Sequence, residues 1–353
     1  MNKNIYAKNI FLILLLIILL MMIHFQTPKK KIGVIGVRHC NNIGANLLKY
    51  AMSIKLTELG FIPYIIGTHY KNRNIRFLKK NTNCIIIKNN FSEIKKKDFD
   101  FLMVNSDQTW RKFDNFFYDH AFLKFSKNWN KPKFIYGASL GYSKWKFSKK
   151  EDIMIKNLLK KFTGISTREK GSIKLIKKHL GIKAVLVLDP TLLIDKKYYL
   201  KILSDYVGKK PVSNNYIFTY LIKTGKKIKS FINNSSKLLG YELFNADKFE
   251  INSIEKFIYG IANCKAVITN SYHGTIFSII FNKPFVVFLY KGNPSERFKS
   301  LGEILRIKNR IFNYYESPNI NLLMTPLNIN YTYINFLKNF SINYIKKNLG
   351  LIF

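Results

Sequence analysis

The chain has 353 residues, enough for two domains of ordinary size, and its 47% hydrophobic content excludes a disordered protein. Its formal net charge is +39, because 59 lysines and arginines outnumber 20 aspartates and glutamates, and such a surface favours anionic partners. The lysines are spread over the whole chain without an RNP, zinc-finger or helix-turn-helix pattern, so no nucleic-acid partner is expected. The three cysteines lie far apart and predict neither a disulfide framework nor a metal site.

Residues 10–23, IFLILLLIILLMMI, form an uncharged apolar run near the start of the chain. The run is shorter than the roughly 17 to 25 residues that span a bilayer comfortably, although His24, Phe25 and flanking lysines extend it. A cleaved signal peptide fits the length, but no small-residue cleavage site follows. We expect an uncleaved single-pass anchor that contacts the membrane through residues 10–25. Positive charge on both sides leaves its orientation open.

The globular part opens on a buried parallel strand, KIGVIGV at residues 31–37, followed by a helical pattern over residues 45–59. A second strand at residues 61–67 completes a Rossmann-like unit without a GxGxxG motif, so a dinucleotide is not implied. Asn41 and Asn42 occupy the turn between the first strand and the helix. Their amides either bind hydroxyls of a ligand or only cap the helix.

Two later strands place polar residues at their carboxyl ends, where ligands bind in open α/β sheets. The strand at residues 99–104 is followed by Ser106 and Asp107, and the strand at residues 133–139 ends in Ser139. These residues predict a binding edge.

Arg168 follows a strand at residues 164–166, where a helix begins. A guanidinium at a helix amino end is a candidate clamp for phosphate or carboxylate, because its planar fork binds such groups through two hydrogen bonds. The alternative is a structural ion pair with Glu169 or with a neighbouring helix. Asp189 follows the strand at residues 184–188 and is predicted only to cap a tight turn.

The second domain follows a linker at residues 208–215 and again alternates strands with helices. Its central unit, AVITNSYHGTIFSIIFNKPFVVF at residues 266–288, predicts a strand, a turn, a helix and a strand. Ser271 and His273 lie where the helix begins, and unpaired backbone N–H groups favour anions there. Gly274 lacks a side chain and would let a ligand approach the backbone. A histidine that only satisfies the helix start is the alternative interpretation.

The predicted fold class is therefore α/β, with two doubly wound Rossmann-like domains that face each other across a cleft. We place the hydrophobic anchor helix at residues 1–30, the first domain at residues 31–207 and the second at residues 208–325. Residues 326–353 contain a last helix, predicted at residues 331–348, that packs back on the first domain.

Six blocks resemble the sequences of one family, the polysaccharide pyruvyl transferases. They are HCNNIGANLLKYA at 39–51, VNSDQTW at 104–110, FIYGASLG at 134–141, ISTRE at 165–169, VLDPTLL at 187–193 and NSYHGTIFSIIFNKPFV at 270–286. The blocks occur in family order and cover the chain from about residue 32 to residue 310. The resemblance implies a fold like that of the GT-B glycosyltransferases.

The resemblance also implies transfer of the pyruvyl group of phosphoenolpyruvate onto hydroxyls of a glycan sugar, which forms a pyruvate ketal. Phosphoenolpyruvate is then the donor substrate, and no metal or other cofactor is implied. The implied catalytic residues are His273 as an acid or phosphate ligand, Arg168 as the anion clamp and Asp107 as a base for the acceptor hydroxyl. The expected substrate-binding residues are Asn41, Asn42, Gly44, Ser106, Ser139, Ser271, Tyr272, Gly274, Lys291 and Arg297.

Two other functions remain open from the sequence. A nucleotide-sugar-dependent GT-B glycosyltransferase keeps the fold and uses His273 and Arg168 to hold a diphosphate. A non-catalytic, membrane-anchored glycan-binding protein keeps only the binding surface. Because phosphoenolpyruvate is a cytosolic metabolite, we expect the catalytic domain on the cytoplasmic side of the membrane. For Lys291 and Arg297, a solvated surface position is the alternative to substrate binding.

Overall fold

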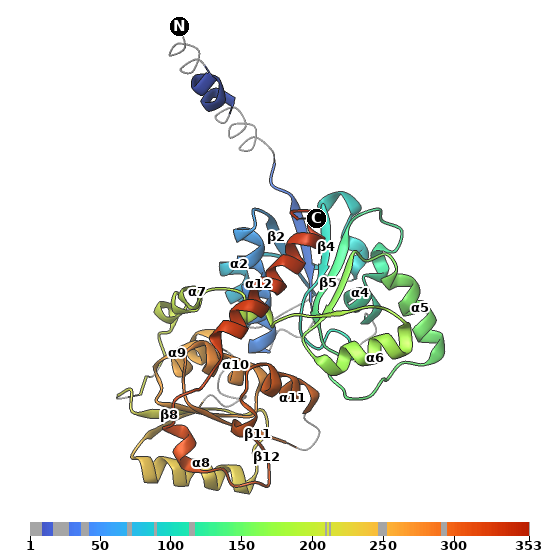
Figure 1. The fold of residues 1–353 in the computed structure, drawn as a ribbon. Helices are drawn as coiled ribbons and strands as arrows, with labels where there is room; N and C mark the ends of the chain where they lie inside the picture. Colours follow the sequence, from blue (N-terminus) through green and yellow to red (C-terminus); the bar gives the residue numbers. More distant parts are fainter. Residues whose placement is uncertain are drawn as a thin grey trace.

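The computed structural model describes residues 9–16, 28–36, 42–68, 73–87, 90–112, 117–208, 210–211, 213–245, 253–290 and 295–352. Two α/β domains lie one above the other in Figure 1, and each is built around a parallel sheet with helices on its faces. The predicted α/β class with two doubly wound sheets is confirmed.

Among the described residues of the first domain, seven parallel strands are ordered β3-β2-β1-β4-β5-β6-β7. The chain starts in the middle of the sheet, moves outward to β3 and crosses back to β4, which creates the topological switch point of a Rossmann fold. The strands are β1 (Lys31–Ile35), β2 (Ile62–Thr68), β3 (Asn83–Ile87), β4 (Phe101–Val104), β5 (Lys133–Ala138), β6 (Gly164–Thr167) and β7 (Val185–Leu186). The helices are α2 (Ile43–Glu58), α3 (Arg73–Asn81), α4 (Phe117–Phe122), α5 (Lys149–Leu159), α6 (Lys170–Leu180) and α7 (Lys196–Leu200).

The part of residues 213–313 that the structure describes forms a second sheet of five parallel strands, ordered β12-β11-β10-β8-β9. Strand β10 lies at its centre, so the unit predicted from the sequence supplies the middle of this domain. The strands are β8 (Tyr216–Tyr220), β9 (Glu242–Asn245), β10 (Ala266–Thr269), β11 (Phe285–Leu289) and β12 (Ile311–Asn313). The helices are α8 (Lys226–Leu239), α9 (Ile254–Asn263), α10 (Tyr272–Ile280) and α11 (Ser295–Ile304).

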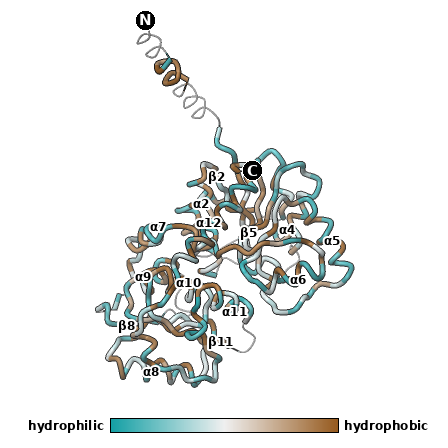
Figure 2. Tube along the Cα trace, in the orientation of Figure 1, coloured by the Kyte–Doolittle hydropathy of each residue, from teal (hydrophilic) through white to brown (hydrophobic). Residues whose placement is uncertain are grey.

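Central strands of both sheets are buried on both faces. Every residue of β4, β5 and β10 is buried, which explains why these segments are continuous apolar runs instead of alternating patterns. Brown, hydrophobic segments accordingly run through the interior of both domains in Figure 2, and the teal, hydrophilic segments lie mainly at the outside.

The last helix, α12 (Tyr331–Asn348), has the bounds that the sequence predicts. Ser341 Oγ accepts a hydrogen bond from Leu188 N at 2.9 Å, and Tyr344 Oη donates to the Ile135 carbonyl at 2.8 Å. The helix therefore leaves the second domain and lies against the first sheet, as Figure 1 shows for the red helix. The chain therefore passes between the two domains twice, first before β8 and again before α12.

Within the described residues, no helix is long and apolar enough to span a membrane. Of the predicted anchor, residues 9–16 are described and are helical, and their side chains are exposed. The rest of the apolar run lies outside the described residues.

Candidate functional site

Three charged side chains meet at the carboxyl edge of the first sheet. Asp107 follows β4, Arg168 follows β6 and Asp189 follows β7, so the parallel strands bring together residues that are distant in sequence. Arg168 Nη1 donates to Asp189 Oδ2 at 2.6 Å, and Nη2 donates to Asp107 Oδ1 at 3.1 Å. All three side chains are buried. The guanidinium is thus held between two carboxylates.

Asp107 has a left-handed backbone with φ of 118°. This region is uncommon for a residue other than glycine and costs on the order of 1–3 kcal/mol, so the surrounding structure must hold it. An isolated parallel bridge pairs Asp107 with Ala138, and the Asp107 carbonyl accepts hydrogen bonds from Thr109 N at 2.7 Å and Ser139 N at 2.9 Å. Strain held at such a position is typical of functional sites.

The second domain contributes an imidazole to the same cluster. Ser271 caps α10 by accepting from Gly274 N at 3.3 Å, which fixes His273 in the first turn of the helix. His273 Nε2 lies 3.7 Å from Asp189 Oδ2, across the boundary between the domains. That nitrogen is buried and has no hydrogen-bond partner among the described residues. The imidazole and the guanidinium therefore share one carboxylate.

The charges of this cluster stabilise one another. Burial alone would lower the pKa of Arg168, but Tyr272 and the carboxylates of Asp189 and Asp107 raise it above its ordinary value. Burial alone would raise the pKa of Asp189, but the neighbouring His273 and Arg168 hold it well below its usual range. Asp189 and Arg168 are therefore both ionised at neutral pH.

Two glycines, one in the first turn of α2 and one in the first turn of α10, allow close packing around His273. A Cβ atom on Gly44, in the first turn of α2, would lie 1.9 Å from His273 Nδ1, so glycine lets this turn contact the imidazole. A Cβ on Gly274 would lie 2.4 Å from Thr269 Oγ1. The space above Gly274 is thus filled by the Thr269 side chain, which corrects the expectation that it admits a ligand.

Tyr272 separates two arginines at the domain boundary. Its ring centroid lies 4.6 Å from Arg168 Cζ and 5.3 Å from Arg297 Cζ, which are cation–π distances. Arg297, on α11, is buried, and the structure pairs it with no carboxylate among the described residues. Burial and the charge of Arg168 lower the pKa of Arg297. The carboxylates of Glu169 and Asp107 oppose this lowering, but neither forms an ion pair with Arg297. A buried cation that has no ion pair among the described residues favours an anionic ligand. The alternative of a solvated surface position for Arg297 is therefore wrong.

Two predicted binding serines hold backbone segments instead. Ser106 Oγ donates to the Gly137 carbonyl at 2.7 Å, and Ser139 Oγ accepts from Gly141 N at 3.1 Å. Both side chains are buried. They shape the loops that carry Asp107.

Of the remaining predicted residues, Asn42 is among those that the structure describes. Asn42 caps α2 by accepting from Ala45 N at 3.2 Å, in agreement with the capping interpretation. Asn41 and Lys291 lie outside the described residues.

Asp189 is the site residue that the sequence interpretation missed. Its Oδ1 accepts from Thr191 N at 3.1 Å, so it does cap the turn, while Oδ2 binds Arg168. The available signal was its place at the carboxyl end of a parallel strand, the same rule that selected Asp107. Glu169, considered as a partner of Arg168, instead accepts a hydrogen bond from Ser172 Oγ at 2.8 Å.

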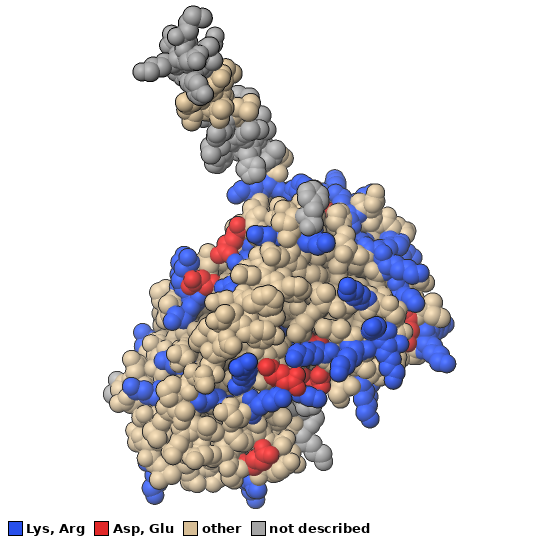
Figure 3. Space-filling view, in the orientation of Figure 1, with Lys and Arg blue, Asp and Glu red and all other residues tan. Residues whose placement is uncertain are grey.

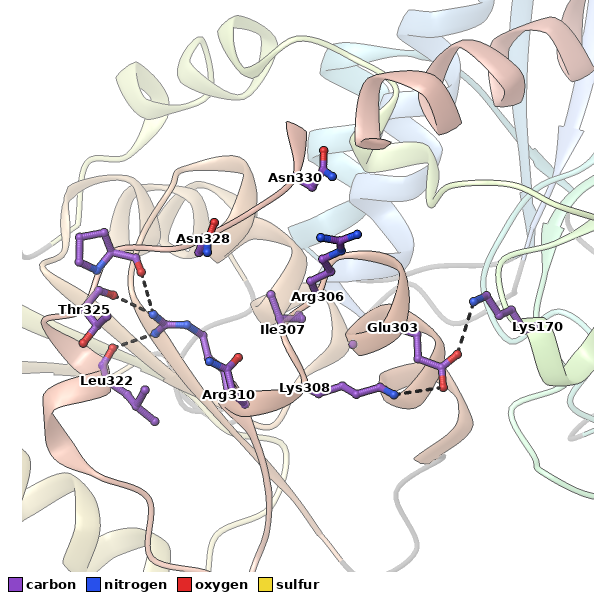
Figure 4. A pocket seen from close by; sticks show the side chains of 13 residues that line it. Lys170, Glu303, Arg306, Ile307, Lys308, Arg310, Leu322, Thr325, Asn328 and Asn330 are labelled. Atoms are coloured by element: carbon purple, nitrogen blue, oxygen red, sulfur yellow. Dashed lines mark hydrogen bonds and ion pairs between the residues drawn. The ribbon is translucent and has the colours of Figure 1, made fainter. Parts of the chain in front are cut away.

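The cavity in Figure 4 lies between the start of α6 and the end of α11 and has a volume of about 950 Å³. Glu303 lies 3.5 Å from the Nζ atoms of both Lys170 and Lys308, and Arg310 donates to backbone carbonyls at its wall. None of the predicted site residues lines this cavity. In Figure 3, lysines and arginines are scattered over the side of the molecule that faces the viewer, and acidic side chains are fewer there.

No group of three or more histidine, cysteine, aspartate or glutamate side chains in the described ranges is placed to hold a metal ion. The cluster itself presents an imidazole, two guanidinium groups and two carboxylates.

The family model for polysaccharide pyruvyl transferases matches residues 42–292, most of the chain. The chain belongs to the polysaccharide pyruvyl transferase family. As a member of that family it is a transferase that modifies glycans. The match spans the cluster built by Asp107, Arg168, Asp189 and His273. A search of curated proteins found no matching relative.

Solved structures show which fold this pyruvyl transferase family member adopts. UGT89C1 of Arabidopsis thaliana, crystallised with UDP-L-rhamnose, is similar with a TM-score of 0.54 and 9% identity over 92% of this chain and 98% of that one. MnaA of S. aureus, solved with UDP, is similar with a TM-score of 0.50 and 15% identity over 92% and 98% of the two chains. The similarity supports the GT-B-like fold alone.

Proposed function

We propose that the protein transfers the pyruvyl group of phosphoenolpyruvate onto two hydroxyls of a glycan sugar, giving a pyruvate ketal and inorganic phosphate. One observation carries the proposal: His273 from one domain and Arg168 from the other both contact Asp189, and Arg297, which has no ion pair among the described residues, packs on the neighbouring Tyr272. A small donor with a phosphate and a carboxylate needs fixed cations and a proton donor close together. Within the family to which the chain belongs, this cluster supports that chemistry.

The roles follow from which groups are already occupied. Both terminal nitrogens of Arg168 are bonded to carboxylates. We therefore assign Arg168 mainly to positioning Asp107 and Asp189, and not to binding the donor by itself. Arg297 Nε and His273 Nε2 are buried without a hydrogen-bond partner among the described residues, although His273 Nε2 lies 3.7 Å from Asp189 Oδ2, and we assign both side chains to the donor anion. This assignment changes the role that the sequence suggested for Arg168.

The reaction balances with these groups. A proton from His273 adds to the methylene carbon of the donor, and the cationic carbon next to it is attacked by the first sugar hydroxyl, whose proton passes to a base. Asp107 is the candidate base, because its carboxylate is held in place by Arg168. The second hydroxyl displaces phosphate and loses its proton to it. One hydroxyl proton thus replaces the proton lost by His273, and the other leaves with the phosphate.

The test is turnover by the purified full chain with phosphoenolpyruvate and a panel of glycan acceptors, followed by phosphate release and by acceptor mass. We expect His273→Ala to lower turnover at least ~100-fold, because it removes the proton donor. His179→Ala is the matched control, since His179 lies at the far end of α6, stacked on Trp145, and its loss should leave turnover unchanged. Phosphate release that is equal in the wild type and the His273 variant would contradict the proposal, as would turnover with a nucleotide sugar alone.

We also propose that residues 10–25 attach the protein to the membrane, with the catalytic domains on the cytoplasmic side where phosphoenolpyruvate is available. The described helix at residues 9–16 exposes Ile10, Phe11 and its other apolar side chains, which supports an apolar partner. Membrane fractionation should place the full chain in the pellet and a variant that begins at Pro28 in the supernatant. Equal distribution of the two proteins would overturn this part.

A further inference from the structure

A second cavity, of about 520 Å³, opens at the carboxyl edge of the second sheet. Strands β8, β11 and β12 end at this edge, as does β10, which leads to His273. Figure 1 shows α8, β11 and β12 together in the lower domain. The lining consists of three lysines, three tyrosines and small or aliphatic residues, namely Lys223, Lys226, Lys227, Tyr290, Tyr314, Tyr315, Thr224, Gly225 and Ile228.

Hydrogen bonds connect this cavity directly to the loop that carries the catalytic imidazole. Asn270, three residues before His273, accepts from Ile222 N at 2.6 Å and donates to the Lys223 carbonyl at 2.5 Å. The segment that begins the cavity wall is therefore fixed to the end of β10. A ligand bound in the cavity lies on the same sheet edge as the proposed site of pyruvyl transfer.

The cavity combines aromatic faces with positive charge. Tyr314 and Tyr315 are 45% and 56% exposed, and their rings meet edge to face with centroids 5.4 Å apart. Lys223 Nζ lies 5.3 Å from the centroid of Tyr290, and Lys227 Nζ donates to the Tyr315 carbonyl at 3.0 Å. No acidic side chain lines this cavity within the described residues, in contrast to Glu303 in the larger one. Its charge is thus not neutralised from inside.

This chemistry matches an acidic saccharide. The C–H faces of pyranose rings pack on exposed tyrosine rings, and ammonium groups bind phosphate or carboxylate through charge-assisted hydrogen bonds. The volume lies in the range of roughly 300–1,000 Å³ that holds ligands much larger than a three-carbon donor. We propose that this cavity binds the acceptor glycan, an oligosaccharide that carries a phosphate or carboxylate group. This inference rests on the proposed function.

The experiment measures direct binding by calorimetry at physiological ionic strength, in the absence of phosphoenolpyruvate. The probes are maltotetraose, maltotetraose 1-phosphate and tetragalacturonate, which separate the sugar, phosphate and carboxylate contributions. The test variant is Lys226→Gln with Tyr314→Leu. The matched control is Lys237→Gln with Tyr333→Leu, because Lys237 lies near the other end of α8 and Tyr333 lies on α12, both exposed and outside the cavity.

We expect an acidic probe to bind more tightly than maltotetraose, and the test variant to weaken that binding at least ~10-fold, the loss typical of one charge-assisted contact. The control should bind like the wild type, and phosphoenolpyruvate binding should be unchanged in all proteins. In turnover, the KM for the acceptor should rise without a fall in kcat.

Equal weakening in test and control variants would show that the probes bind only the general positive charge of the chain and would overturn the proposal. Preferential binding of UDP-glucose, lost in the test variant, would reassign the cavity to a nucleotide and overturn it as well. Because binding is measured without turnover, either result is separate from the outcome for His273→Ala.

Discussion

The two sheets bring polar groups of different character to the boundary between the domains. At the edge of the first sheet, both terminal nitrogens of Arg168 are bonded to carboxylates, those of Asp107 and Asp189, and only its Nε is buried without a hydrogen-bond partner among the described residues. At the edge of the second sheet, His273 Nε2 and Arg297 Nε are buried without hydrogen-bond partners among the described residues. Burying an unpaired polar group costs free energy, whereas a paired one is tolerated. The first edge therefore contains ion-paired charges, and we propose that the second binds the ligand.

Replacing the two arginines should separate these roles most clearly. Arg168→Gln leaves two buried carboxylates without their counter-ion, and we expect it to lower the free energy of unfolding by about 3–5 kcal/mol. Arg297→Gln removes a buried charge that has no ion-pair partner among the described residues, so we expect stability to change by less than about 1 kcal/mol while phosphoenolpyruvate binding weakens at least ~10-fold. Urea unfolding and donor titration measure the two effects.

The comparison fails if the two variants lose the same stability, or if Arg297→Gln binds the donor like the wild type. An Arg297→Lys variant keeps the charge and should recover part of the binding, which distinguishes loss of charge from loss of packing on Tyr272.

The ion pair between Arg168 and Asp189 at the edge of the first sheet should also make the stability of the protein depend on pH. The pKa of Asp189 is lowered in the folded state, so its contribution to stability is fully present above the unfolded value of about 4 and is lost as the pH falls below it. Asp189→Asn should therefore be about 2–3 kcal/mol less stable than the wild type at pH 7. The difference between the two proteins should shrink as urea unfolding is repeated toward pH 2. A difference that is constant with pH would show that Asp189 contributes through packing alone.

A substitution at Gly44 tests how closely α2 of the first domain must approach His273 of the second. Gly44→Ala places a methyl group in the space of the His273 imidazole, so we expect a loss of about 1–3 kcal/mol through overpacking. The displaced imidazole should also lower turnover at least ~10-fold, because small displacements of a catalytic group are costly. Unchanged turnover would show that His273 has room to move and that the contact with α2 is unimportant.

Much of the fold could be predicted because its strands are short apolar runs and its helices carry clear signals. Helix α12 has the bounds that the sequence predicts, and β10 is the first strand of the unit predicted at residues 266–288. Helix α5 follows the Ser148 cap and has two acidic residues in its first turn, which is a clear helix start. Strand β12 was not predicted, because its three residues are ordered only by pairing with β11. Helix α3, RNIRFLKKN, is so basic that the stretch indicates loops, although its own Phe77 and Leu78 are buried.

The candidate site was predictable in its positions and less so in its pairing. Strand ends and helix starts selected Asp107, Arg168 and His273, because parallel sheets bring those positions together. Asp189 was missed as a site residue because its capping contact with Thr191 explains it locally. Arg168 forms hydrogen bonds with two carboxylates because of the directions in which side chains point after β4, β6 and β7. The spacing of residues in one sequence does not specify those directions.

The smallest effect is expected at Asn42, where the sequence left capping and ligand binding open. Its side chain accepts a hydrogen bond from Ala45 N and so satisfies a free N–H group at the start of α2. If capping is its whole role, Asn42→Ala should cost about 1 kcal/mol in urea unfolding, and Asn42→Ser should recover most of that loss. Both variants should then keep the wild-type KM for donor and acceptor. A raised KM in both, with Asn42→Ser as stable as the wild type, would instead place Asn42 with the unpaired groups that face the ligand.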